Sequence, residues 1–166
     1  MPFAVTHVLI PMIVVDLIRD HLFKNKKHLL PNKFVFTAGL TGLLPDLDVP
    51  ISYFTVGNLE FHRTITHSIF FPIGFFCLFL FFYFVRHKPF LWKFFLMCFV
   101  GFSFHIILDF YIFGTVSLFF PLTGELYGLN IFPIEKMYLV YSAVDAILLF
   151  LWLVHEELEH KISDFF

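Results

Sequence analysis

The sequence predicts an all-α integral membrane protein, a polytopic helical bundle of about four spans plus one half-helix or re-entrant segment. Hydrophobic residues make up 59% of the 166 residues, charged residues make up only 14%, and the mean hydropathy is +0.84. The 28 phenylalanines are more than a globule of this size can bury. Residues 69–85 and 94–108 contain no Asp, Glu, Lys or Arg. The length fits one membrane-embedded domain over residues 1–166.

The N-terminal part predicts one full helix and one short one. The first helix is expected from Pro2 to Leu22. The next apolar segment, Phe34 to Leu44, has only eleven residues. At about 1.5 Å per residue it reaches about halfway across a bilayer. Residues 45–66 then predict an irregular connection, which protein or a water-filled cavity must cover at membrane depth.

Three further helices are expected over about 66–85, 94–113 and 135–153. Thr66 is suited to cap the first of them. A Gly- and Pro-containing loop over residues 114–134 precedes the last helix, and an acidic tail follows it.

The basic residues predict the orientation in the membrane. Nine of the eleven lie in three segments: residues 19–33, residues 86–93 and the C-terminal tail. The opposite loops hold only Arg63 and Lys136. The positive-inside rule therefore places the three basic segments in the cytoplasm, and residues 45–66 and 114–134 on the extracytoplasmic side of the inner (plasma) membrane.

This orientation gathers polar residues in the outer half of the bundle. His105 and Asp109 are four apart on a helix, so they share a face about 6 Å apart along the axis. They are suited to bind one ion or two neighbouring ions. The alternative is a buried His–Asp hydrogen bond that ties helices together. An Asp at a span centre costs about 2.5–3.5 kcal/mol, and such residues usually mark function.

A second polar group lies in the predicted irregular connection. Asp46 and Asp48 flank one leucine, and two carboxylates so close repel each other unless a cation lies between them. The alternative is a turn with an Asp cap. His62 and His67 are five apart, and neutral imidazole is a common zinc ligand. A solvated loop His and a turn His are the alternatives. Arg63 follows His62 directly.

Two more residues complete the predicted set. His7 is preceded by Thr6, as His67 is preceded by Thr66. Asp145 is a single acid in an apolar helix, and a helix-tethering hydrogen bond is its alternative role. The candidate metal ligands are His7, Asp46, Asp48, His62, His67, His105, Asp109 and Asp145.

Together these motifs resemble a known family, the membrane-bound metal-dependent hydrolases, also described as LexA-binding, inner-membrane-associated hydrolases. The resemblance is carried by T-H at 6–7, P-D-x-D at 45–48, H-R-x-x-T-H-S at 62–68, H-x-x-x-D at 105–109, and Asp145. The family often has Pro after this last Asp, where this chain has Ala146. The family is more distantly similar to the zinc-dependent phospholipase C and single-strand nuclease group, whose members hold three zinc ions with His and Asp. The resemblance implies hydrolysis.

We therefore expect a metal-dependent hydrolase acting on an ester or phosphodiester, as in a lipid or other amphiphile, at the outer half of the membrane. Six to eight ligands exceed what one four-coordinate zinc needs, so two or three divalent ions, most simply zinc, are expected. Adjacent ions would activate a water nucleophile. Arg63 is expected to grip the transferred or leaving group, and Asp48 to act as base or ligand. The expected partners are the bilayer and a lipid or phosphoester substrate, with no nucleic acid.

Three other functions are considered. A lipid-phosphate phosphatase grips phosphate with several basic residues, but the outer side of this chain offers one Arg and one Lys. An ion or proton transporter also uses buried Asp and His, but five short segments without an obvious inverted repeat disfavour it. The third is a membrane-anchored interaction protein with a structural metal site.

Overall fold

The computed structural model describes residues 4–22, 30–57, 62–129, 131 and 134–160, and most of these residues are helical. One isolated bridge between Val116 and Tyr127 is the only β pairing in the described ranges. The all-α prediction is therefore confirmed. The helices in order are α1 (Ala4–Leu22), α2 (Asn32–Thr41), η2 (Pro45–Leu47), α3 (Asp48–Val56), α4 (Phe70–Leu80), η3 (Phe81–Val85), α5 (Pro89–Leu108), η4 (Asp109–Phe113) and α6 (Ile134–His160).

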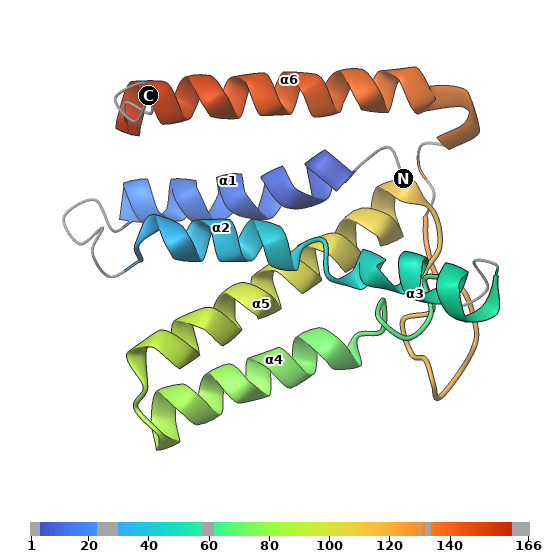
Figure 1. Cartoon of the computed structure of the whole chain (residues 1–166), viewed down its shortest axis with the longest axis horizontal. Coiled ribbons are helices and arrows are strands. Elements are labelled where there is room, and N and C mark those ends of the chain that lie inside the picture. Colours follow the sequence, from blue (N-terminus) through green and yellow to red (C-terminus); the bar gives the residue numbers. More distant parts are fainter. Residues whose placement is uncertain (1–3, 23–29, 58–61, 130, 132–133, 161–166) are drawn as a thin grey trace.

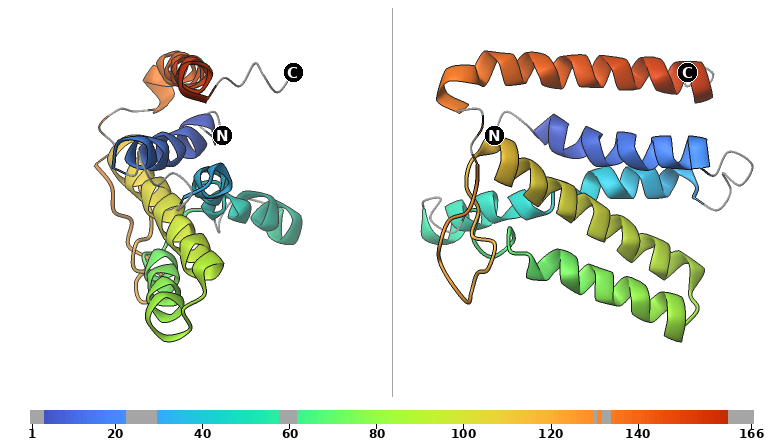
Figure 2. Two further views of the ribbon diagram at one scale, coloured as in Figure 1. Left: turned by 90° about the vertical axis from the view of Figure 1, so that its left-hand side faces the viewer. Right: turned by 180° about the vertical axis from the view of Figure 1, so that it is seen from behind.

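The long helices lie side by side and give the molecule two distinct ends (Figure 1). At one end lie the C-terminal end of α1, the start of α2, the α4–α5 turn and the end of α6. At the other end lie α3, residues 62–69 and the loop that follows η4. Viewed from the side, α6, α1, α5 and α4 are stacked in that order (Figure 2).

The core lies where α1, α2 and α5 meet. Met12 and Val15 of α1 pack with Phe34 and Ala38 of α2 and with Met97 of α5. Farther along α5, Gly101 allows α2 to approach closely, because a Cβ there would collide with the Thr41 side chain and with backbone of α2. This close contact brings the last turns of α5 against the end of α2.

The number of spans is lower than predicted. Two stretches of the described chain, Pro89–Ile112 and Leu139–Leu158, are long and apolar enough to cross a membrane. A third span exists if Asn32–Thr41 and Pro45–Val56, which are bent by 46° at their junction, form one broken segment. The prediction of about four spans, with a half-helix besides, is therefore too high.

Two helices account for this difference. The last two turns of α1 contain Asp16, Arg19 and Asp20, which are too many charges for a simple apolar span. The helical stretch Phe70–Val85 has 16 residues, and about 24 Å of helix is shorter than the hydrocarbon core. It is short because the chain forms turns before Phe70 instead of the helix that was predicted from residue 66.

Several predicted boundaries also differ. The connection over residues 45–66 is not irregular throughout, because residues 45–56 form η2 and α3. The predicted cap Thr66 is wrong, since Ile69 precedes α4 and makes no side-chain cap hydrogen bond. Helix α5 begins at Pro89 and continues through η4 to Phe113, and α6 extends to His160, so both helical stretches are longer than predicted. The predicted helix start at Pro2 and the basic residues Lys24, Lys26, Lys27 and Lys161 lie outside the described residues.

Candidate metal centre

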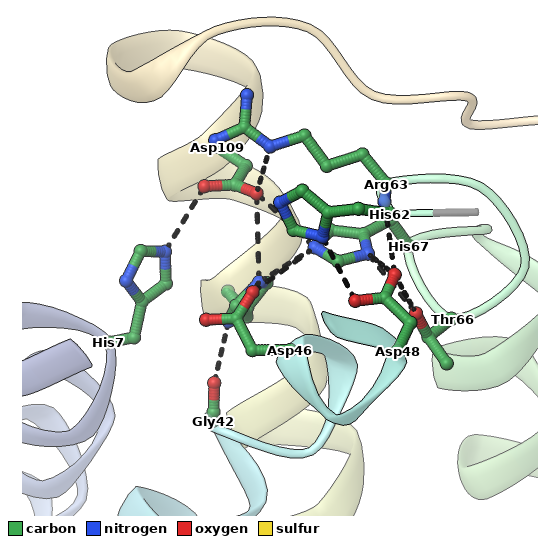
Figure 3. A network of polar contacts seen from close by, with 10 residues as sticks. His7, Gly42, Asp46, Asp48, His62, Arg63, Thr66, His67 and Asp109 are labelled. Atoms are coloured by element: carbon green, nitrogen blue, oxygen red, sulfur yellow. Dashed lines mark hydrogen bonds and ion pairs between the residues drawn. The ribbon is translucent and has the colours of Figure 1, made fainter. Parts of the chain in front are cut away.

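Asp48, the first residue of α3, organises the H-R-T-I-T-H-S segment (Figure 3). Its Oδ2 accepts hydrogen bonds from the backbone N–H of Arg63 at 3.0 Å and from the Thr66 hydroxyl at 2.8 Å. Its Oδ1 lies 2.9 Å from Nδ1 of His62, and its Oδ2 lies 3.2 Å from Nδ1 of His67. One carboxylate therefore fixes the turn and orients both imidazoles through their Nδ1 atoms, which leaves Nε2 of each ring for other partners.

His105 and Asp109 supply the opposite side of the site from the end of α5 and the start of η4. Both are buried, with 0% and 2% of their surface exposed. Nδ1 of His105 lies 2.6 Å from the carbonyl oxygen of Gly42. Because a carbonyl can only accept, Nδ1 carries the proton and Nε2 presents a lone pair to the centre of the site. The close α2–α5 contact positions this ring.

Four ligand atoms from separate segments meet at this centre. Nε2 of His67 lies 3.1 Å from Nε2 of His105, 3.3 Å from Oδ2 of Asp109 and 3.7 Å from Oδ1 of Asp46. Nε2 of His105 lies 3.6 Å from each of the same two carboxylate oxygens. Ligands at 2.0–2.1 Å from a tetrahedral zinc are about 3.3 Å apart. The five distances are close to this spacing, so these side chains could hold one zinc-sized ion.

Two more imidazoles flank this set. His7 of α1 is buried, and its Nε2 lies 3.3 Å from Oδ1 of Asp109. Asp109 thus presents one oxygen to His7 and the other to His67 (Figure 3). Ligand atoms of His7, His105 and Asp109 lie within 4.8 Å of one another, and so do those of Asp46, His62 and His67. These His and Asp groups could hold metal ions.

Arg63 lies at the rim of the centre. Its Nε is 3.5 Å from Oδ2 of Asp109, and 24% of its side chain is exposed. Its backbone is in the left-handed region, with φ at 64°, and its carbonyl accepts a hydrogen bond from the N–H of Ser117. The guanidinium packs against Gly114, where any side chain would collide with it. The Arg63 backbone and Gly114 therefore together hold the guanidinium over the site.

Two carboxylates stabilise the protonated form of His67, the central imidazole of the site. This residue lies outside the candidate membrane spans. Burial disfavours a charged His67, but hydrogen bonds from its ring to Asp109 and Asp48 outweigh burial and raise its pKa to about 9. His67 therefore carries a proton at neutral pH in metal-free protein, and a metal ion would have to displace that proton.

Seven of the eight predicted ligands belong to one contact network, and Asp145 is the exception. Asp145 in α6 is buried and accepts a hydrogen bond from the hydroxyl of Thr6, which ties α6 to α1 beside His7. The contacts described for Asp145 include none of the other predicted ligands. This arrangement matches the helix-tethering alternative.

The sequence reading missed one further group of possible ligands, at the other end of the molecule. Asp16, His155 and Glu156 have ligand atoms within 4.8 Å of one another. Oδ2 of Asp16 lies 3.2 Å from Nε2 of His155, and its Oδ1 contacts the guanidinium of Arg19. Arg19 also bonds Asp20 at 2.9 Å. Because Asp16 already has an arginine partner, this group resembles a brace between α1 and α6 more than a free ligand set. Its sequence signals were the charges in α1 and the adjacent His155 and Glu156 in α6.

The comparisons with known proteins bear on the whole chain. A search of curated proteins returned no match, and a search of solved structures returned none either. One family model, described as YdjM inner membrane protein, matches residues 1–161. This match and the apolar helices indicate the inner membrane. The chain belongs to the YdjM inner membrane protein family.

Proposed function

We propose that this protein is a membrane-bound, metal-dependent hydrolase that acts on a phosphodiester or other ester of a lipid or amphiphile. The proposal rests on the donor atoms of Asp46, His67, His105 and Asp109, which come from segments far apart in the sequence. Nε2 of each histidine lies 3.1–3.7 Å from Nε2 of the other and from one oxygen of each aspartate. Imidazole nitrogen and carboxylate oxygen are the ligands of catalytic zinc. His7 and His62 lie next to the set and would supply ligands to further ions.

A bound zinc ion would supply a Lewis acid and lower the pKa of water toward neutrality. The residues do the remaining work. Asp48 orients His62 and His67 and stays outside both three-residue ligand groups, so we now favour a positioning role for it over that of ligand or base. Arg63 presents a partly exposed guanidinium beside Asp109, where it would pair with an oxyanion of the substrate.

The position of the site favours an amphiphilic substrate. Helix α3 begins at the site with Asp48 and carries the strongly exposed side chains of Ile51, Tyr53 and Phe54. In the membrane these side chains face lipid. A single guanidinium with a cluster of imidazoles and carboxylates fits metal-assisted hydrolysis better than an arginine- and lysine-rich phosphatase site.

We further propose that the site faces the extracytoplasmic side. Lys33 lies in the first turn of α2, Arg86 and Lys88 lie in the α4–α5 turn, and Lys93 lies near the start of α5. These segments form the end of the molecule opposite α3, where the metal centre lies (Figure 1). The positive-inside rule assigns that end to the cytoplasm. A thiol-reactive, membrane-impermeant label on a cysteine introduced at Leu122 would test this, since that side chain is 75% exposed in the loop near the site.

The activity is tested with the full chain reconstituted in lipid vesicles. Vesicles are assayed with a chromogenic phosphodiester and with fluorescent lipid esters, before chelation, after chelation and after zinc is restored. We expect turnover that chelation abolishes, that zinc restores and that His67→Gln lacks. Zinc bound at full stoichiometry without turnover of any ester would instead assign the ion a structural role.

A further inference from the structure

An apolar groove lies between α1 and α5, toward the end of the molecule away from the metal centre. Val15 and Ile18 of α1 line it, together with Trp92, Leu96 and Val100 of α5. Its volume is about 480 Å³, and every lining residue except Lys93 is apolar. Helix α5 is a candidate membrane span, so this groove opens to lipid tails. Its walls suit a hydrocarbon chain and offer nothing to a polar ligand.

Lys93 of α5 lines this groove, and Lys33 of α2 shares an aromatic neighbour, Phe34, with it. Nζ of Lys33 is 5.5 Å from the ring centre of Phe34 and 5.3 Å from that of Phe90. Nζ of Lys93 is 5.9 Å from the same Phe34 ring and 5.4 Å from the Trp92 ring. Both ammonium groups are therefore held near one aromatic ring by cation–π contacts.

No carboxylate neutralises these two charges within the described ranges of the chain. The ion pairs nearest in sequence use Arg19 with Asp16 and Asp20 and do not include either lysine. Lys33 is exposed and Lys93 is half-buried, so both can reach an external anion. Two unpaired cations beside an apolar groove are complementary to a molecule with an anionic head and a hydrocarbon tail.

We propose that this groove binds an anionic phospholipid, with one acyl chain between α1 and α5 and the phosphate held by Lys33 and Lys93. Trp92 lines the groove beside Lys93, and amphipathic rings of this kind favour the membrane interface. Twelve residues separate Lys93 from His105, which is about 18 Å along α5. The lipid is therefore a bound component distant from the metal centre, and its binding does not depend on the proposed hydrolysis.

Tryptophan fluorescence tests this proposal directly. The chain has two tryptophans, so Trp152→Phe leaves Trp92 as the only one. The full-length variant is placed in phosphatidylcholine bilayers that contain increasing fractions of brominated phosphatidylglycerol or brominated phosphatidylcholine. Bromine on a chain in the groove quenches Trp92. At about fivefold for each lysine near an anionic headgroup, we expect the anionic lipid to reach half-maximal quenching at a roughly five- to twenty-five-fold lower fraction. High salt should reduce this preference.

Matched variants separate the groove from general surface charge. In the Trp152→Phe background, Lys33→Gln with Lys93→Gln should abolish the preference for the anionic lipid. Arg86→Gln with Lys88→Gln removes two exposed charges from the adjacent turn and should leave the preference intact. If the double variant Lys33→Gln with Lys93→Gln does not fold, the single variants Lys33→Gln and Lys93→Gln should each lower the preference about fivefold. Equal quenching by both lipids, or equal losses in the two double variants, would overturn the proposal.

Discussion

Replacement of His67 by glutamine is the sharpest test of the metal centre. Its Nε2 contacts three other candidate ligands at 3.1–3.7 Å, and its side chain is fully buried. Four-ligand zinc sites have apparent binding free energies of about 10–16 kcal/mol, so one ligand accounts for about 2.5–4 kcal/mol. The His67→Gln variant should therefore bind zinc two to three orders of magnitude more weakly than the native protein.

The assay is a zinc titration of purified full-length protein against a fluorescent chelator, with elemental analysis after dialysis. His155→Gln is the matched control, because this histidine also pairs with a buried aspartate, Asp16, at 3.2 Å. Its loss should leave zinc affinity unchanged. Unaltered zinc affinity in His67→Gln would refute the assignment. Loss of zinc in His155→Gln alone would move the metal to the group formed by Asp16, His155 and Glu156.

Three further predictions concern orientation, pH and stability. Asp48→Asn should weaken zinc binding about 10–100-fold in the same titration, less than His67→Gln does, because it removes an orienting partner; the reverse order would make Asp48 a ligand. The raised pKa of His67, about 9 against 6.5, means that its protonated form stabilises metal-stripped protein below about pH 6.5 and that this stabilisation is lost as the pH rises to about 9. The thermal midpoint of stripped protein should fall over this range, while zinc affinity rises by up to about tenfold per pH unit because zinc displaces the proton; a flat midpoint would contradict the shift. Arg19→Met should lower the free energy of unfolding by about 3–5 kcal/mol in a denaturant titration, because Asp16 and Asp20 lose their cation; zinc stoichiometry should not change, and a change would link the two ends of the molecule.

The sequence predicted which polar residues gather better than it predicted the number of spans, and the reason is physical. A charge in an apolar chain is costly wherever the chain folds, so Asp46, His67 and Asp109 stood out without any knowledge of the fold. The number of spans depends instead on whether the charged side chains of each helix are paired inside the protein. In α1, Asp16 and Arg19 face inward and neutralise each other, which composition alone does not reveal.

The errors in the connecting segment have a tertiary cause. Thr66 was expected to cap a helix from its position in the sequence, a local argument. In the structure its hydroxyl bonds Asp48, eighteen residues earlier, and α4 begins later. Similarly, Asp145 bonds Thr6 from the opposite end of the chain. Such pairings depend on which helices become neighbours, so spacing along the sequence could not predict them.

Buried carboxylates are neutralised by different partners at the two polar ends of the molecule. This difference supports an exchangeable cation at only one end. At the basic end, Arg19 gives Asp16 and Asp20 a permanent positive partner. At the other end, Asp46, Asp48 and Asp109 face one guanidinium and several imidazoles, whose protons can leave. With neutral imidazoles, three carboxylates and one arginine leave a charge of −2 in a buried site. A divalent ion would balance that charge, and the imidazole nitrogens that lose their protons would become its ligands.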